Sequence, residues 1–100
     1  MQDKRFNYQG NITTTETDIL TTPVARRTIV TGIRFINQGS ADIYAEARIN
    51  SNPVLVGVIA SKDGIYDKDT RLELLPGQSL SLIGEGSGLK YCITVVEVDN

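Results

Sequence analysis

The sequence predicts an all-β protein, an antiparallel β-sandwich of jelly-roll or immunoglobulin-like type with about seven or eight strands. Short segments rich in Val, Ile, Thr and Tyr alternate with clusters of Gly, Asn, Asp, Ser and Pro, the residue types that favour turns. No segment repeats its apolar residues with a helical period over about ten residues or more. At 100 residues, the chain has room for a single hydrophobic core.

The clearest strand covers residues 42–50. Ile43, Ala45, Ala47 and Ile49 alternate there with polar and charged residues. A period of two places the four apolar side chains on the core face and the charges in water. A strand over residues 28–36 precedes it, and the loop between them contains Gly39, which favours a hairpin.

Two longer apolar runs follow. Residues 54–60 are apolar apart from Gly57, which predicts a strand buried on both faces. The second face is covered either by the chain itself or by a neighbouring subunit. Residues 89–98 also carry apolar side chains on both faces, and this predicts a central strand or one that lies under an interface.

The remaining segments have weaker patterns. Residues 70–75 and 78–83 alternate as strands on either side of the turn pair Pro76-Gly77, and residues 84–88 form a glycine-rich hairpin tip. Residues 11–20 are rich in threonine and predict an edge strand. Residues 1–10 are polar and aperiodic. We therefore expect an extended N-terminal arm, residues 1–10, and a β-sandwich domain, residues 11–100.

The composition narrows the possible functions. The formal net charge of −2 gives no electrostatic reason to expect a nucleic-acid partner, because nucleic acid binds to a basic face. The first residues lack the apolar stretch of a signal peptide, and no run has the roughly 20 apolar residues of a membrane span. The sequence contains no His, the commonest general base, and no nucleophile elbow or phosphate-binding loop. We expect no enzymatic activity, no cofactor and no membrane contact.

Two further features of the sequence bear on possible sites. The single cysteine, Cys92, lies in an apolar run and is expected to be a small buried residue. The acidic residues Asp63, Asp67, Asp69 and Glu73 alternate as calcium ligands can, but three basic residues lie among them. This mixture favours a solvated loop with balanced charge, and we predict no metal site.

Four residues are candidates for partner binding. Phe6 and Tyr8 are aromatic residues in a polar terminus, so they either pack back on the sandwich or anchor the arm to a neighbour. Arg26 and Arg27 form a charge pair at the start of a predicted strand. They are either an exposed pair without a partner or contacts to an acidic surface of another protein.

Two segments resemble a known family. Residues 22–43 contain the run Thr28-Ile29-Val30-Thr31, then Phe35-Ile36-Asn37, a small-residue turn and an alternating strand. Residues 74–82 contain Leu75-Pro76-Gly77 followed by alternating leucines. Together they resemble small β-sandwich structural proteins in the virions of tailed bacteriophages, over about residues 22–98.

The resemblance implies a structural role in a virion that is assembled from proteins made in the host cytoplasm. The first expectation is a capsid decoration or cement protein that stabilises the shell through subunit interfaces. Its partners would be the major capsid protein or another virion protein, with a homo-oligomer such as a trimer. The alternatives are a tail, neck or fibre component of the virion and a small carbohydrate- or ligand-binding module, for which Tyr44 is the outward aromatic residue.

Overall fold

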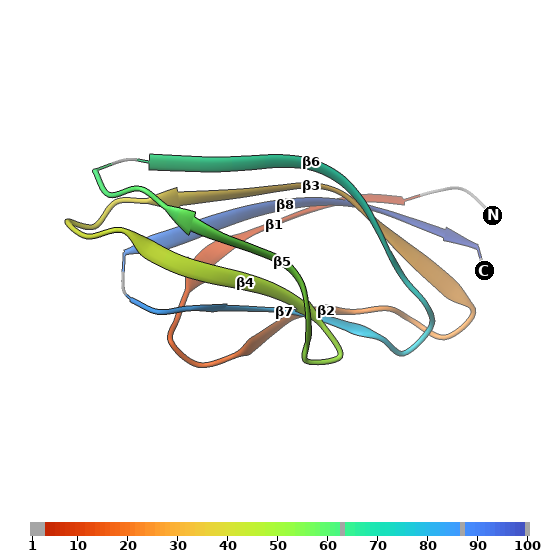
Figure 1. Ribbon diagram of the computed structural model, residues 1–100. Helices are drawn as coiled ribbons and strands as arrows, with labels where there is room; N and C mark the ends of the chain where they lie inside the picture. The colour runs from red at the N-terminus through yellow and green to blue at the C-terminus, as the bar shows by residue number, and fades with distance from the viewer. Residues whose placement is uncertain (1–3, 63, 87, 100) are drawn as a thin grey trace.

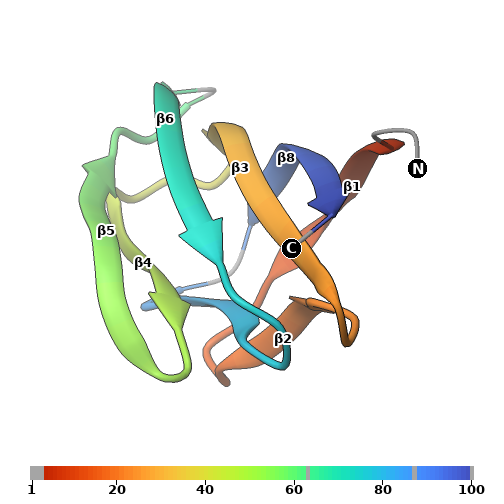
Figure 2. The same ribbon diagram turned by 90° about the vertical axis from the view of Figure 1, so that its right-hand side faces the viewer.

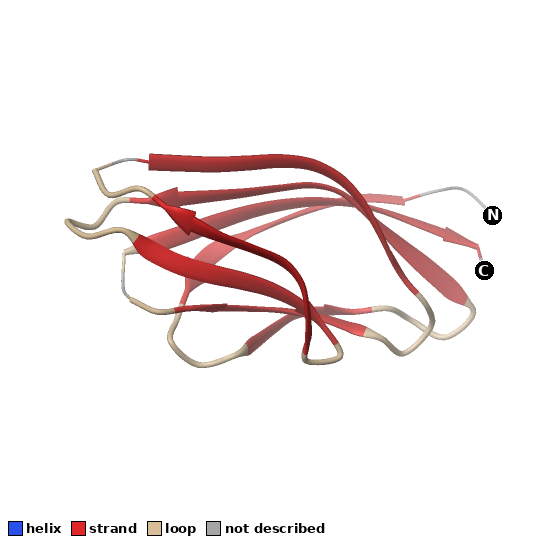
Figure 3. Ribbon diagram, viewed as in Figure 1, coloured by secondary structure: helices blue, strands red, loops and turns tan. Residues whose placement is uncertain are grey.

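The computed structural model describes residues 4–62, 64–86 and 88–99, and for residues 66–70 only the backbone. Its described residues form eight strands in two four-stranded antiparallel sheets packed face to face (Figure 1, Figure 3). Sheet A has the order β1-β8-β3-β6, and sheet B has the order β2-β7-β4-β5. The strands are β1 (Lys4–Ile12), β2 (Thr17–Thr21), β3 (Arg26–Asn37), β4 (Ile43–Ile49), β5 (Asn52–Ile59), β6 (Gly64–Leu74), β7 (Ser79–Gly84) and β8 (Leu89–Asp99).

The strand pairs are nested along the chain. β1 pairs with β8, β2 with β7, β3 with β6 and β4 with β5, as in one long hairpin with the β4–β5 turn at its tip. The hairpin is rolled up, so that β8 also pairs with β3 and β7 with β4. This is the topology of a jelly roll. The predicted sandwich is confirmed, and of its two predicted types the jelly roll is the one formed.

The core lies between the sheets. On β4, Ile43, Ala45 and Ala47 are buried and Ile49 is half-buried, as the alternation over residues 42–50 predicts. The central position of β8, predicted from its apolar residues, is also confirmed, because β8 lies between β1 and β3. The buried apolar residues are Ile12, Ile29, Val30, Ile33, Phe35, Ile43, Ala45, Ala47, Ile59, Leu74, Leu80, Leu82, Leu89, Ile93 and Val95.

The predicted N-terminal arm is wrong for residues 4–10. These residues belong to β1, which pairs with β8 along its whole length and is an edge strand of sheet A. Gly10 interrupts the apolar alternation and conceals the strand. A Cβ at Gly10 would lie 3.0 Å from the hydroxyl oxygen of Tyr91, so the missing side chain makes room for that ring. Residues 1–3 lie outside the described residues.

Strand β6 begins earlier than predicted. Gly64 starts the strand, and its pairing with β3 runs from Gly64 opposite Asn37 to Leu74 opposite Thr28. The expected charged loop over these residues is therefore an edge strand. The pairing of β6 with β3 shifts register between Val30 and Gly32, so β6 does not alternate regularly. Its charged residues suit an edge strand, because charges there discourage pairing with other chains. Of the acidic cluster, Asp63 and the side chains of Asp67 and Asp69 lie outside the described part of the chain.

Candidate functional site

The main surface feature is a row of exposed valines on β5, the outermost strand of sheet B. Val54, Val56 and Val58 are 39%, 48% and 63% exposed. Val56 lies opposite Glu46 and Val58 opposite Tyr44, so both point to the outer face of the sheet. Of the two covers expected for the second face, the chain itself is the wrong one: among the described residues it covers only the inner face of β5. Cover by a neighbouring subunit stays a prediction.

The inner face of β5 is held firmly in the sandwich. Ile59 is buried in the core and Leu55 packs against it. The two-residue turn Asn50-Ser51, with φ values of 48° and 66°, has the positive angles of a type I′ hairpin and sets the pairing with β4. Because the inner side is packed and the turn is tight, the outward valines belong to a well-positioned strand.

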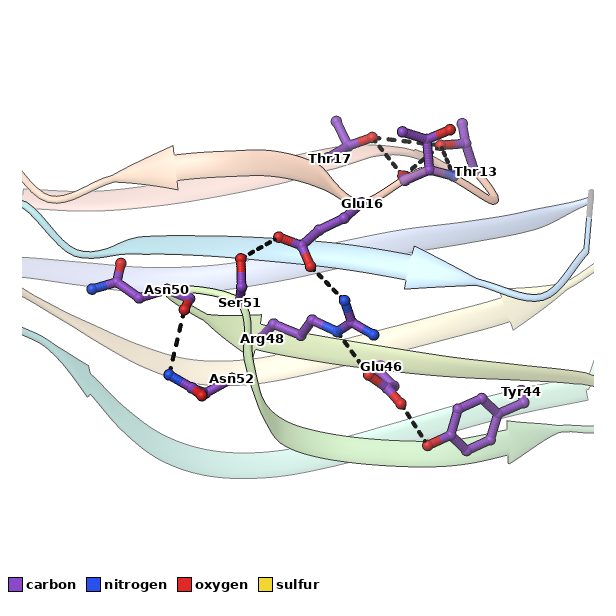
Figure 4. Close-up of polar contacts among 10 residues, drawn as sticks. Thr13, Glu16, Thr17, Tyr44, Glu46, Arg48, Asn50, Ser51 and Asn52 are labelled. Carbon is purple, nitrogen blue, oxygen red and sulfur yellow. Dashed lines mark hydrogen bonds and ion pairs between the residues drawn. The ribbon is translucent and has the colours of Figure 1, made fainter.

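Figure 4 shows a polar network on the outer face of sheet B. It includes Tyr44 and Glu46, the residues opposite Val58 and Val56. The Tyr44 hydroxyl donates to Glu46 Oε2 at 2.8 Å, and Arg48 Nε donates to Glu46 Oε1 at 2.7 Å. Arg48 Nη1 also donates to Glu16 Oε1 at 2.5 Å, and the Ser51 hydroxyl donates to Glu16 Oε2 at 2.8 Å. The chain of contacts ties the loop before β2 to β4 and to the hairpin turn.

The network shifts the ionisation of its members. The hydrogen bonds from Arg48 and then Ser51 hold the pKa of Glu16 below its ordinary value. Those from Tyr44 and then Arg48 do the same for the pKa of Glu46, while the pKa of Tyr44 is raised because its hydroxyl is bonded to that carboxylate. Both carboxylates are thus kept ionised, because hydrogen bonds donated to the charged form of a group stabilise that form. Such groups do not act as general acids near neutral pH.

The aromatic candidates lie on β1. Tyr8 packs against the core, whereas Phe6 is 39% exposed, and the two ring centroids are 6.4 Å apart. Of the two placements expected for these rings, packing on the sandwich holds for Tyr8. Phe6 remains available at the surface.

The arginine candidates differ in their surroundings. Arg26 is buried: its Nε donates to Glu97 Oε1 at 2.9 Å, its Nη2 donates to the Glu97 carbonyl at 3.1 Å, and its Nη1 pairs with Asp99. The expectation that Arg26 is an exposed charge without a partner is therefore wrong. Arg27 is partly exposed, and its Nη1 lies 3.8 Å from Glu73 Oε2. Phe6 and Tyr8 lie on β1, the two arginines lie at the start of β3, and β8 separates these two strands in sheet A.

The surroundings of Cys92 do not form a deep site. Cys92 is partly exposed on β8 opposite Gln9 and Arg34, not fully buried as expected. Surface hollows near it are shallow and are lined by residues of β1, β3 and β8. Within the described part of the chain, no three His, Cys, Asp or Glu side chains gather closely enough to hold a metal ion. No helix among the described residues is long and apolar enough to cross a membrane.

Sequence reasoning missed the edge position of the valine row. An unbroken apolar run signals burial on both faces, and it does not show which strand ends a sheet. The one available signal was Pro53 at the start of the run, because proline in sheets is confined to edge strands, first residues and bulges.

No protein-family model matches the sequence, and no curated protein matches it. Solved structures do share the fold. A chain of the disulfide-linked pili formed by Bacillus endospore appendages aligns with a TM-score of 0.61 at 10% identity, over 99% of this chain and 88% of that chain. A chain of the acidic stable capsid of Helicobacter pylori bacteriophage KHP30 aligns with a TM-score of 0.62 at 4% identity, over 96% and 86%.

A third structure, the T13 viral particle of IBDV, aligns with a TM-score of 0.51 at 9% identity. It covers 97% of this chain but only 31% of that chain. At these identities the likeness concerns the fold alone. The class defined by the fold and the surface is therefore an eight-stranded jelly-roll domain with an apolar outer strand, and similar domains occur in viral capsids and in endospore pili.

Proposed function

We propose that this protein is a structural subunit of a virion, a decoration or cement protein that stabilises the capsid shell through subunit interfaces. The observation that carries the proposal is the exposed valine row of β5 on a rigid jelly roll. Contiguous apolar side chains on a soluble surface mark a site of protein contact. Jelly-roll domains occur in viral capsids, and the fold is similar to that of a phage capsid chain.

In this role the protein carries out no chemical step. Its stabilising effect comes from apolar surface that is removed from water when the subunit binds a virion protein or further copies of itself. A lasting contact of this kind buries about 1,200 Å² or more in total. The β5 row supplies part of such an area, and the exposed Phe6 on β1 is a second apolar contact.

The proposal is tested by locating the protein in intact material from its source. Antibodies raised against the purified protein are used to label negatively stained samples in the electron microscope. Label over the shells of regular particles is the expected result. Label confined to tails or fibres would replace the cement role by the tail, neck or fibre role, and label on no particle would overturn both.

A filament subunit, including a tail or fibre component, is the second candidate. It is favoured by the open edges at both sides of each sheet: β1 and β6 in sheet A, and β2 and β5 in sheet B. Contacts between unlike edges repeat head to tail and generate rings or filaments. The same labelling experiment separates this candidate from the first.

The carbohydrate-binding module is disfavoured by the environment of Tyr44. Sugar-binding sheets present free aromatic faces, whereas the Tyr44 hydroxyl is bonded to Glu46 and the ring is partly buried. The sequence also contains no Trp. Binding to a glycan array at Tyr44, lost in Tyr44→Ala, would reverse this order of candidates.

A further inference from the structure

The four edge strands of the sandwich are protected to different extents. Edge strands expose unpaired backbone groups, and proteins guard them with charges, proline, bulges or short length. β1 begins with Lys4 and Arg5, and β2 has five residues and a register shift after Asp18. The sequence of β6 has five charged residues among its eleven. Beyond Arg5, β1 has no charge and no proline, but its exposed outward side chains are the polar Asn7, Gln9 and Asn11, whereas those of β5 are valines.

β5 is guarded at one end only. Pro53 lies near its start, and Val54 is the extra residue where the register shifts between Ala47 and Arg48. From Leu55 to Ile59 the strand is regular, has no charge and has no proline. Figure 2 shows β5 at the left-hand side of the sandwich, with β6 of the other sheet to its right. Among the described residues, no strand pairs with the outer edge of this five-residue segment, so its backbone is open to another strand.

We infer that the free edge of β5 pairs with the β5 edge of a second copy of this protein. This pairing rests on the proposed structural role and would be one contact between neighbouring copies in the assembly. The two strands run antiparallel about a two-fold axis, and the two copies of sheet B become one continuous eight-stranded sheet. Such an interface uses the same patch on both subunits, as closed dimers do.

The register follows from the limits of the free segment. Pro53 and the Val54 bulge end it on one side, and on the other the strand itself ends at Ile59. The midpoint is Gly57, which is placed on the two-fold axis. Val56 of each copy then lies opposite Val58 of the other, and β-branched pairs of this kind stabilise a sheet.

Charge favours a second copy over an unrelated partner. Like charges that face each other destabilise a symmetric strand pair. Because β5 has no charged residue, pairing with a second β5 brings no like charges together. An acidic or basic peptide would gain no ion pair from this edge. The exposed valines instead match a neutral, β-branched strand, and β5 itself is such a strand.

The contact is small by itself. Five residues of strand extend about 17 Å, so the pairing buries less than the roughly 1,200 Å² of a stable interface. We therefore expect a weak dimer in solution, with a dissociation constant of about 10 to 100 μM. In an assembly, further contacts would act together with this one.

The test is sedimentation equilibrium of the full chain up to about 1 mM, a concentration well above the expected dissociation constant. Wild type is expected to change from monomer to twice its 10.9 kDa mass. Val58→Lys places a charge on the free edge and is expected to weaken dimerisation by about tenfold or more. Val24→Lys, which alters an 88% exposed valine in a loop, is the matched control and leaves dimerisation unchanged.

Wild type that stays monomeric throughout, or equal effects of the two lysine variants, would overturn the inference. Thermal unfolding of each variant shows that the monomer fold is retained. The register is tested separately by mild oxidation of Val56→Cys/Val58→Cys in a Cys92→Ser background. A covalent dimer supports pairing about Gly57, and no covalent dimer at concentrations where wild type dimerises would overturn that register.

The outcomes of the two proposals are distinguishable. A monomeric protein that labels virus shells would contradict β5 pairing and leave the structural role standing. A dimer disrupted by Val58→Lys, from a protein found on no particle, would support β5 pairing and contradict the virion role.

Discussion

The side-chain amide of Asn37 donates a hydrogen bond to the carbonyl oxygen of Ile59 at 2.9 Å, and so joins the end of β3 in one sheet to the end of β5 in the other. Asn37 is fully buried, and it also donates to the carbonyl oxygen of Ala41 at 2.8 Å and accepts from the amide of Gly39 at 2.9 Å. The last residue of the free β5 segment is thus fixed to the opposite sheet. Its position does not depend on a partner.

Asn37→Ala is expected to destabilise the fold by about 3 kcal/mol, because it leaves buried backbone groups without partners. Urea unfolding measures the change. Asn52→Ala removes an exposed amide that bonds to the Asn50 carbonyl at 3.3 Å, and it should cost less than about 0.5 kcal/mol. Equal losses for the two variants would contradict the structural role assigned to Asn37.

The buried Arg26 ties the start of β3 to the end of β8 through Glu97 and Asp99. Arg26→Met leaves a partly buried Glu97 carboxylate without its partner, and removal of one member of a buried pair is far more costly than removal of an exposed one. We expect its unfolding midpoint to fall several times further than that of Arg71→Met. Arg71 is 68% exposed in its ion pair with Glu73 and is the matched control. A similar midpoint for both variants would be evidence against the clamp.

Acid is expected to weaken the polar network of sheet B. The pKa values of Glu16 and Glu46 are below their ordinary value of 4.5 in the folded protein. Their contribution to stability is therefore complete above that value and is lost as the pH falls through the lower, folded values. The unfolding midpoint in urea should decrease between neutral pH and about pH 3.

Glu46→Gln removes one of these titrating groups, so its midpoint should change less with pH than that of wild type. Glu85→Gln, at an exposed position outside the hydrogen-bonded network, provides the comparison. If Glu46→Gln loses stability with acid as steeply as Glu85→Gln, the network has no role in the pH dependence.

The two aromatic residues of β1 should separate folding from binding. Tyr8→Ala removes a ring packed on the core and is expected to cost about 2 kcal/mol, whereas Phe6→Ala should cost less than about 1 kcal/mol. If Phe6 is a contact to the virion, Phe6→Ala lowers the amount of protein that sediments with particles. Full co-sedimentation of Phe6→Ala would exclude Phe6 as an anchor. Deletion of residues 1–10 would test this contact less well than Phe6→Ala, because the deletion also removes most of β1 and so disturbs the fold.

Much of the fold was predictable from local patterns. The alternation over residues 42–50 and the turn residues beyond Asn50 gave both strand faces and a hairpin, because side-chain direction in a strand follows from a period of two. β1 was missed because Gly10 breaks its pattern, and the ring that fills the gap, Tyr91, is about 80 residues away in the sequence.

The candidate site depended on information of longer range. The valines of β5 and the apolar residues of β8 look alike in the sequence, yet β8 is central and β5 is an edge. Strand order decides which apolar face is covered, and strand order is set by pairing between distant segments. The burial of Arg26 has the same origin, since its partners are at the far end of the chain.

The central claim is that this jelly roll assembles through the free edge of β5. Hydrogen–deuterium exchange of backbone amides, compared between dilute and concentrated protein, tests it most directly. We predict that amides within residues 55–59 exchange more slowly in the concentrated sample, while those of β1, β2 and β6 are unchanged. Exchange within 55–59 that is independent of concentration, or protection confined to another edge strand, would contradict the claim.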